Sequence, residues 1–529
     1  MVGFKKTVKF FFKQKNLVLL GLILLLGAFL RLYKIDGYMT FLGDEGRDGL
    51  VWLRMVRWGK FTLIGPQTSI GNMYLGPLYY YLMLPFYVLF GLSPVGPSVG
   101  VALFGIATIF LIWWMGREWF GEVASLIAAF LYAISPVVIT YSRSSWNPNI
   151  MPFFALLTIW GIWGFWGKEN YLWLPVIGIT LSFCLQSHYL GLLLLPLVGI
   201  FWGIRVIGEI RESKTQKEFI LYTLYFILLL LLLTVMPLVW FDLRHDFINT
   251  KAFYKFFSVR QTTVNLKVYK AIPNLWPLWE MMIIRLSAAK EIFWGRILSF
   301  VLFLGLVFSF WRSFWRSDLP AGRTSPDSPG KKALVLLLVW LLIGLMGMGL
   351  YKQHIYDHYF GFIFPAPFLL VGFLLGELGK SRRLGRLGFL GVLGIVTWLN
   401  LMNSPLNYQP NYQMAKVQEI DKKIIEEAGG QPFNFALIAK QNYEAGYEYF
   451  LEAWRATLVH IDPQKVDETI ADQLFVVCED KECQPINHPK AQIANFGWAK
   501  IDDEWEFPWG VKLFKLVHLE KSDEQKVKS

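Results

Sequence analysis

Long apolar segments alternate with short polar ones over most of the chain. A membrane-spanning helix needs roughly twenty predominantly apolar residues, and about eleven segments meet that requirement. They are residues 17–34, 97–116, 121–140, 150–167, 171–188, 189–207, 219–241, 295–311, 333–351, 359–377 and 386–403. The pattern predicts a mainly α-helical, multi-pass membrane protein, with a membrane domain at residues 1–403.

The pattern changes near residue 404, where short apolar runs alternate with polar stretches. Residues 433–439, 473–477 and 511–517 have the character of strands, and residues 443–456 have the spacing of a helix. We therefore expect residues 404–529 to form a small soluble α/β domain.

Composition agrees with a membrane protein. The 529 residues are 55% hydrophobic and 17% charged, whereas soluble domains have about 25% charged residues. The net charge of +12 does not indicate nucleic acid binding, because the basic residues occur in short segments between apolar runs. Basic loops of this kind favour the cytoplasmic side of a membrane.

The basic N-terminus and the alternating basic loops predict a cytoplasmic N-terminus. The first outer loop is then residues 35–96, and the C-terminal domain is extracytoplasmic. Residues 49–58 and 77–90 are amphipathic and are expected to lie along the membrane surface. The other outer segments are residues 141–149, 242–296 and 351–358.

The first outer loop contains adjacent carboxylates, Asp44 and Glu45, between Gly43 and Gly46. The glycines are expected to let the backbone turn and present the acids. Charged groups near a bilayer are costly and tend to mark function. The alternative is an ordinary solvated loop.

Other ionisable residues also fall on the predicted outer face. Arg143 has a forked donor suited to phosphate or carboxylate, but arginines at span ends also serve as interfacial anchors. His188, where two spans meet, is either a site residue or a helix-packing residue. His354, Asp357 and His358 have side chains that bind a divalent metal or a phosphate, although their spacing matches no standard metal signature.

Three cysteines are present. Cys184 lies in an apolar span and is expected to be a small core residue. Cys478 and Cys483 lie close together in the C-terminal domain, where they form a disulfide or remain two free thiols.

The order of the polar motifs resembles that of the GT-C membrane glycosyltransferases, in the branch of protein O-mannosyltransferases and aminoarabinose transferases (bacterial glycosyltransferase family 39-like). The resemblance covers residues 15–405. Its motifs are Asp44-Glu45, Gly76-Pro-Leu-Tyr-Tyr-Tyr81, Tyr141-Ser-Arg143, Gln186-Ser-His-Tyr189, and Asp357-His-Tyr359 leading into Pro365-Ala-Pro367.

The resemblance implies a polyprenyl-phosphate sugar donor, used outside the cytoplasm, and a protein, glycan or lipid acceptor. It also implies inverting transfer, with Asp44 as general base and Glu45 beside it. The residues expected to bind the donor phosphate or substrate are Arg47, Arg143, Asn147, His188, His358 and Tyr359.

Departures from the family pattern concern the sugar and any metal requirement. Related enzymes often have a lysine where this chain has Leu75, and an acid where it has Asn147 or Asn149. A divalent metal remains open, with His354, Asp357 and His358 as candidates.

Two functions from other classes stay open at this point. One is a transporter or flippase of lipid-linked sugars, which predicts charged pairs within spans and related halves of the chain. The other is a non-catalytic protein of envelope glycan assembly, which predicts that Asp44 is dispensable.

Overall fold

The computed structural model describes residues 2–68, 73–211, 217–258, 263–265, 267–315, 329–380, 383–480 and 482–519. These residues form two compact units. The helical unit comprises Met1–Ile35, Thr62–Phe86 and Gly96–Gln409, and the mixed unit comprises Asp36–Phe61, Tyr87–Val95 and Pro410–Ser529. The division differs from the expected boundary near residue 404, because part of the first outer loop belongs to the same unit as the C-terminal segment.

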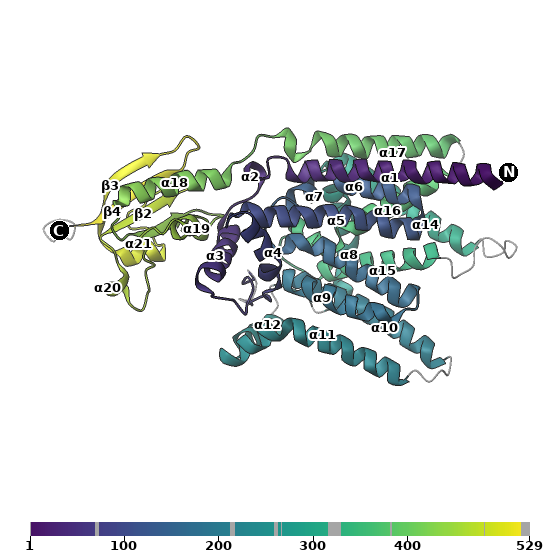
Figure 1. The fold of residues 1–529 in the computed structure, drawn as a ribbon, viewed down its shortest axis with the longest axis horizontal. Helices are drawn as coiled ribbons and strands as arrows, with labels where there is room; N and C mark the ends of the chain where they lie inside the picture. Colours follow the sequence, from purple (N-terminus) through teal and green to yellow (C-terminus); the bar gives the residue numbers. More distant parts are fainter. Residues whose placement is uncertain are drawn as a thin grey trace. The chain divides into compact units, whose positions relative to one another are not determined.

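The helical unit is built almost entirely of helices (Figure 1). Its α-helices are α1 (Val2–Leu32), α5 (Val95–Phe120), α6 (Glu122–Ile134), α7 (Pro136–Tyr141), α8 (Met151–Ile162), α9 (Leu174–Ser187), α10 (Leu194–Arg211), α11 (Lys217–Arg244), α12 (Ile248–Ser258), α13 (Leu275–Leu286), α14 (Ile292–Trp315), α15 (Pro329–Gly349), α16 (Pro365–Gly379) and α17 (Arg383–Met402). Short turns of other helix types are η1 (Asn147–Ile150), η2 (Trp163–Gly167), η3 (Tyr171–Trp173), η4 (Tyr189–Leu193), η5 (Val268–Asn274), η6 (Asp357–Ile363) and η7 (Pro405–Asn407). Two further helices, α2 (Ile35–Tyr38) and α4 (Leu78–Leu89), include residues of both units, and the first residue of α5, Val95, also belongs to the mixed unit.

The predicted mainly α-helical membrane fold is confirmed. Each of the expected apolar segments falls on helix, but fewer qualify as full spans. Among the described residues, seven helices are long and apolar enough to cross a membrane, or eight if η6 and α16, bent by 63°, count as one span. Helix α6 is shorter than its predicted span because it ends before Pro136, whose ring disfavours helix in the preceding residue. Helices α12 and α13 were not predicted.

Packing in the helical unit joins segments distant in sequence. Helix α6 packs against α16 and α1, and α9 packs against α8 and α11. Where α6 ends, the Ser135 hydroxyl donates to the Leu286 carbonyl of α13 at 2.7 Å. Ser135, between α6 and α7, therefore also holds the C-terminal end of α13 through this hydrogen bond.

The mixed unit contains a four-stranded sheet in the order β1-β2-β4-β3 (Figure 1). Strands β1 and β2 are parallel, and the other neighbouring pairs are antiparallel. Its elements are α3 (Gly43–Trp58), α18 (Gln413–Ala428), β1 (Asn434–Ile438), α19 (Ala445–Ala453), α20 (Val466–Thr469), β2 (Gln473–Cys478), α21 (Ala491–Phe496), β3 (Ala499–Glu506) and β4 (Lys512–His518).

The burial of each strand explains whether its sequence pattern predicted it. Strands β1 and β2 are buried at every position, as their continuous apolar runs predict. Strand β3 is mostly exposed and rich in acids, so it has no apolar alternation to detect. It lies at the sheet edge, where charged side chains discourage pairing with other chains. Cys478, at the end of β2, is joined to Cys483 by a disulfide.

Helix α3 begins at Gly43, so the acidic pair lies in the first turn of a helix and not in a free turn. The Glu45 carboxylate accepts the Leu42 backbone N–H at 3.0 Å, which satisfies a donor that the helix start leaves open. The helix ends at Gly59, which has φ 63° and donates its N–H to the Met55 carbonyl at 3.1 Å.

The glycines near the acids permit close packing of α3 against α19 and do not serve a turn. A Cβ at Gly46 would lie within 3.0 Å of the Ala445 carbonyl oxygen. At Gly43 it would meet the ring of Tyr443, and at Gly49 the ring of Tyr449, again within 3.0 Å. Because the three glycines recur every third residue, they form one helix face.

An ion pair stabilises the packing of α3 against α19 near the C-terminal end of α3. Arg54 binds Glu452 through two hydrogen bonds, Nε to Oε1 at 3.0 Å and Nη2 to Oε2 at 2.7 Å, a bidentate geometry. Arg57 donates to the Ala453 carbonyl at 2.8 Å at the end of α19. Helix α3 is therefore fixed along its length.

We expect Gly46→Ala to destabilise the mixed unit by roughly 1–3 kcal/mol, the usual cost of overpacking, because the added methyl meets backbone and not a movable side chain. Gly391→Ala in α17 is the matched control, since its Cβ would meet nothing within 4 Å. Thermal unfolding of both variants in detergent checks this. An equal Tm for the two would contradict the close contact.

Protein isolated and denatured without reductant is expected to show one reactive thiol per chain, that of Cys184, because Cys478 and Cys483 are bonded. Reduction should raise the number to three. The measurement is a thiol titration before and after reduction, with Cys184→Ala as the control that removes the first signal. Three thiols before reduction would argue against the disulfide.

Candidate functional site

The acidic start of α3, defined as Asp44, Glu45 and Asp48, presents one accessible carboxylate. The side chain of Asp44 is 39% exposed. Its Oδ1 accepts hydrogen bonds from Arg47 Nη1 and from the Tyr443 hydroxyl, both at 2.7 Å. Among the described residues no donor binds its other oxygen, Oδ2. A carboxylate held by one oxygen, with the other unbound, is arranged to accept a proton.

Glu45 is in a different environment although it is the next residue. It is 6% exposed, and its carboxylate accepts a hydrogen bond from the Leu42 N–H. Burial, and to a lesser extent the neighbouring charge of Asp44, raise its pKa to about 7. Glu45 is therefore partly protonated near neutral pH and adds less negative charge beside Asp44.

Arg47 lies between two of the carboxylates. Its Nη1 binds Asp44, while Nε and Nη2 donate to Asp48 Oδ1 at 3.0 and 2.8 Å. Asp48 is fully buried. Arg47 was expected to bind donor phosphate; within the mixed unit it donates to the carboxylates of Asp44 and Asp48 and supplies positive charge that stabilises them.

Asn442 and Tyr443 were missed by the sequence analysis. Asn442 Oδ1 accepts the Gly43 N–H at 2.9 Å, at the start of α3, and Tyr443 binds Asp44. No motif marks them, and 399 residues separate each from its partner. A structure was needed to find them.

In the helical unit, the predicted residues His188, His358 and Tyr359 come together. The ring centroids of His188 and His358 lie 5.7 Å apart, and those of Tyr359 lie 5.3 Å from His188 and 4.7 Å from His358. Asn147 donates to the Ser187 carbonyl at 2.5 Å, so it holds the residue before His188. We call His188, His358 and Tyr359 the histidine–tyrosine cluster.

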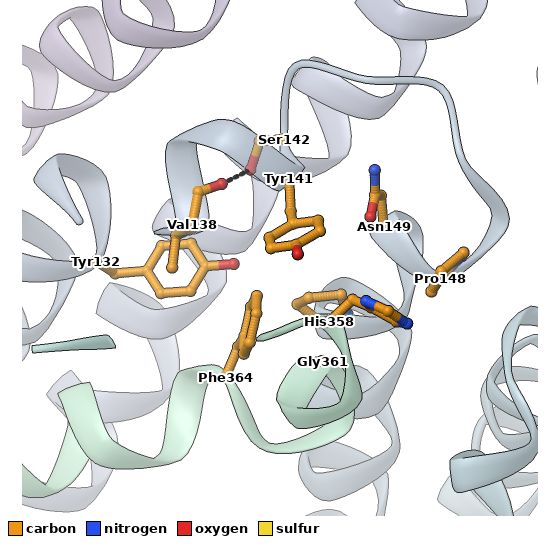
Figure 2. Close-up of a pocket in the computed structure, with 10 residues that line it drawn as sticks. Tyr132, Val138, Tyr141, Ser142, Pro148, Asn149, His358, Gly361 and Phe364 are labelled. Carbon is orange, nitrogen blue, oxygen red and sulfur yellow. Dashed lines mark hydrogen bonds between the residues drawn. The ribbon is translucent and has the colours of Figure 1, made fainter. Parts of the chain in front are cut away.

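His358 also borders a small pocket of the helical unit (Figure 2). The lining residues are Tyr132, Val138, Tyr141, Ser142, Pro148, Asn149, Pro152, His358, Gly361 and Phe364. Figure 2 shows the rings of Tyr132, Tyr141 and Phe364 around it, with the Ser142 hydroxyl donating to the Val138 carbonyl at 2.6 Å. The lining is aromatic with a few polar groups.

The candidate metal residues do not converge. Asp357 instead pairs with Arg285 at 3.2 Å and with Lys290 at 2.8 Å. His354 contacts the edge of Tyr356 with ring centroids 4.6 Å apart. Within the ranges that the structure describes, no group of three or more His, Cys, Asp or Glu is placed to hold a metal ion. Arg285 and Lys290 lay in an outer segment whose basic residues the sequence analysis did not single out.

Arg143 has a different position from the one expected of a phosphate ligand. It is 1% exposed, and its guanidinium donates to the carbonyls of Leu30, at 2.7 Å, and Tyr33. These carbonyls lie at the C-terminal end of α1, where helix carbonyls lack partners within the helix. The Tyr-Ser-Arg motif therefore helps fix the end of α1.

Sequence comparisons find similarity to mannosyltransferases. The family model described as dolichyl-phosphate-mannose-protein mannosyltransferase matches residues 75–240, less than half of the chain. A Bacillus subtilis (strain 168) protein, YkcB, whose naming as a mannosyltransferase is itself provisional, is 24% identical over 141 residues. That match covers 26% of this chain and only 19% of YkcB.

Two solved structures share the fold. ArnT from Cupriavidus metallidurans, bound to undecaprenyl phosphate, has a TM-score of 0.59 at 12% identity, covering 94% of this chain and 97% of ArnT. The oligosaccharyltransferase AglB from Archaeoglobus fulgidus, in complex with an inhibitory peptide and a dolichol-phosphate, has a TM-score of 0.52 at 12% identity. That alignment covers 88% of this chain and 70% of AglB. The chain therefore shares its fold with ArnT and AglB, and its residues 75–240 are similar to the dolichyl-phosphate-mannose-protein mannosyltransferase family.

Proposed function

We propose that the chain transfers a monosaccharide from a polyprenyl-phosphate-linked donor to a hydroxyl group of a protein, glycan or lipid acceptor. The acceptor oxygen attacks the anomeric carbon as the bond to the phosphate oxygen breaks. The acceptor proton passes to Asp44, and polyprenyl phosphate leaves with the bonding electrons. Attack opposite the leaving group inverts the anomeric configuration.

The observation that carries this proposal is the difference among the three carboxylates at the start of α3. Glu45 and Asp48 are buried, whereas the Asp44 side chain is 39% exposed and has an oxygen, Oδ2, that no described residue binds. A general base must reach the proton that it removes. Asp44 meets that requirement better than its neighbours.

Positive charge and hydrogen-bond donors surround the Asp44 carboxylate. Arg47 and Tyr443 donate to it, and a helix N-terminus carries partial positive charge that stabilises an anion. Because burial keeps Glu45 partly protonated near pH 7, repulsion from that neighbour is reduced. The acidic start of α3 therefore presents one accessible carboxylate, that of Asp44.

The leaving phosphate requires hydrogen-bond donors and positive charge. Within the helical unit, the histidine–tyrosine cluster has ring N–H and hydroxyl groups that suit a phosphate, and Arg285 and Lys290 lie beside Asp357, adjacent to His358. Such preorganised groups stabilise charge that develops in the transition state. The lipid phosphates bound to ArnT and to AglB support a carrier of this class here.

We further propose that the N-terminus is cytoplasmic and the C-terminal segment extracytoplasmic. The Cys478–Cys483 bond supports this orientation, since disulfides persist in oxidising compartments. The donor would then be used on the outer face of the membrane.

Asp44→Asn is expected to lower kcat by roughly 10²–10⁴-fold, the range for a general base, with Tm and expression unchanged. The assay is sugar transfer by purified protein in lipid with a panel of polyprenyl-phosphate sugars. Glu45→Gln is the matched control, since it neutralises a buried neighbour and should retain most of the activity.

Full activity of Asp44→Asn would remove Asp44 from the role of base. Absence of turnover with every donor, together with movement of lipid-linked sugar across the bilayer, would favour a transporter. Equal loss in Asp44→Asn and Glu45→Gln would indicate that the acids act as a structural pair.

The raised pKa of Glu45 predicts how stability depends on pH. Between its ordinary value of 4.5 and about 7, Glu45 is ionised in the unfolded chain but protonated in the fold, so stability falls as pH rises through this window. The loss in free energy of unfolding reaches on the order of 3 kcal/mol above pH 7 and is absent below pH 4.5.

Glu45→Gln should therefore gain Tm relative to wild type as pH rises from 5 to 8. Glu426→Gln is the control, because that side chain is 71% exposed and should show no such gain. A difference between Glu45→Gln and wild type that is constant over this range would contradict the assignment.

A further inference from the structure

Two consecutive residues of the C-terminal segment bind the first turn of α3. Asn442 accepts the Gly43 N–H, and the Tyr443 hydroxyl donates to Asp44 Oδ1. Both pairs lie within the mixed unit. The acidic turn is therefore completed by residues that follow every apolar segment of the chain.

We propose that Tyr443 is a positioning residue for the general base: its hydroxyl holds Asp44 Oδ1 and directs Oδ2 toward the acceptor. This inference rests on the proposed function and assigns a role in catalysis to the C-terminal segment.

The geometry restricts the Asp44 carboxylate. Tyr443 Oη and Arg47 Nη1 each lie 2.7 Å from the same oxygen, and they lie 3.4 Å from each other. Two donors that converge on one oxygen fix the rotation of the carboxylate as well as its position. Such charge-assisted hydrogen bonds are stronger than neutral ones.

Packing fixes the tyrosine itself. Its ring lies against the first turn of α3 where Gly43 has no side chain, and any Cβ there would overlap the ring. Asn442 sets the register, because its Oδ1 accepts the Gly43 and Tyr443 N–H groups, each at 2.9 Å, and its Nδ2 donates to Glu479 at 2.8 Å. The hydroxyl is therefore placed by contacts independent of Asp44.

The hydroxyl is also suited to be a permanent donor. Burial raises the pKa of Tyr443 well above its ordinary value, although the nearby Arg47 opposes the shift. The phenol stays protonated over any pH at which the chain would work. Tyr443 therefore remains a donor to Asp44 Oδ1 and leaves Oδ2 for the acceptor proton.

Tyr443→Phe tests the role, because it removes the hydroxyl and keeps the ring against Gly43. We expect kcat to fall roughly 10- to 100-fold, as for loss of a hydrogen bond to a charged group. The KM for the lipid-linked donor should be unchanged. The acid limb of the pH–rate profile should move to higher pH, because the carboxylate loses a donor that stabilises its charged form.

Tyr449→Phe is the matched control. Tyr449 is on α19, its ring contacts α3 at Gly49, and its hydroxyl donates to the Leu92 carbonyl at 2.7 Å and pairs with Tyr87, not with an acid. Like Tyr443→Phe, the Tyr449→Phe variant removes one hydroxyl from a tyrosine that packs against a glycine of α3. Its pH–rate profile should match that of wild type.

Assayed beside Asp44→Asn in the full-length protein, the variants separate the two proposals. Wild-type activity in Asp44→Asn overturns the base assignment and this inference with it. Collapse in Asp44→Asn, with Tyr443→Phe indistinguishable from Tyr449→Phe in kcat and pH profile, overturns the inference alone. A shifted acid limb in Tyr443→Phe only, at unchanged Tm, supports it.

Discussion

The close approach of α3 to α19 is the constraint on which the acidic turn depends. At Gly46 the backbones are so near that even a methyl group would overlap the Ala445 carbonyl. The contact brings Tyr443 and Asn442 to the start of α3, and the Arg54–Glu452 pair holds its far end. A side chain added at Gly46 would therefore disturb the packing of α3 against α19, the hydrogen bonds at the start of α3 and the position of the Asp44 carboxylate.

Adjacent residues of α3 acquire different properties because helical geometry points them in different directions. Asp44 is partly exposed and shared by two donors, whereas Glu45 is enclosed and caps the helix that bears both. The contrast follows a common arrangement in enzymes, in which the surroundings of paired carboxylates push their proton affinities apart. Here the burial of Glu45 reduces the negative charge beside Asp44.

Much of the fold was predictable from the sequence, because long apolar runs and short buried strands leave strong local signals. The approach of Asn442 and Tyr443 to the acids was not, since sequence spacing does not report contacts across 399 residues. Local pattern also misassigned the glycines to a turn, because a close helix contact uses the same residue type. Arg143, for which the sequence left a ligand and an anchor open, donates to the carbonyls of Leu30 and Tyr33. The association of His188 with His358 was expected only from the order of motifs.

The separation in sequence between α3 and α19 has a consequence for biosynthesis. Helix α3 follows the first apolar segment and is made before the other apolar segments, whereas the surface against which it packs, beginning at Ala445, is made after all of them. During translation the glycine face of α3 therefore stays uncovered until those segments have been made. A chain that stopped before Ala445 would contain the acids but lack the contacts that align them.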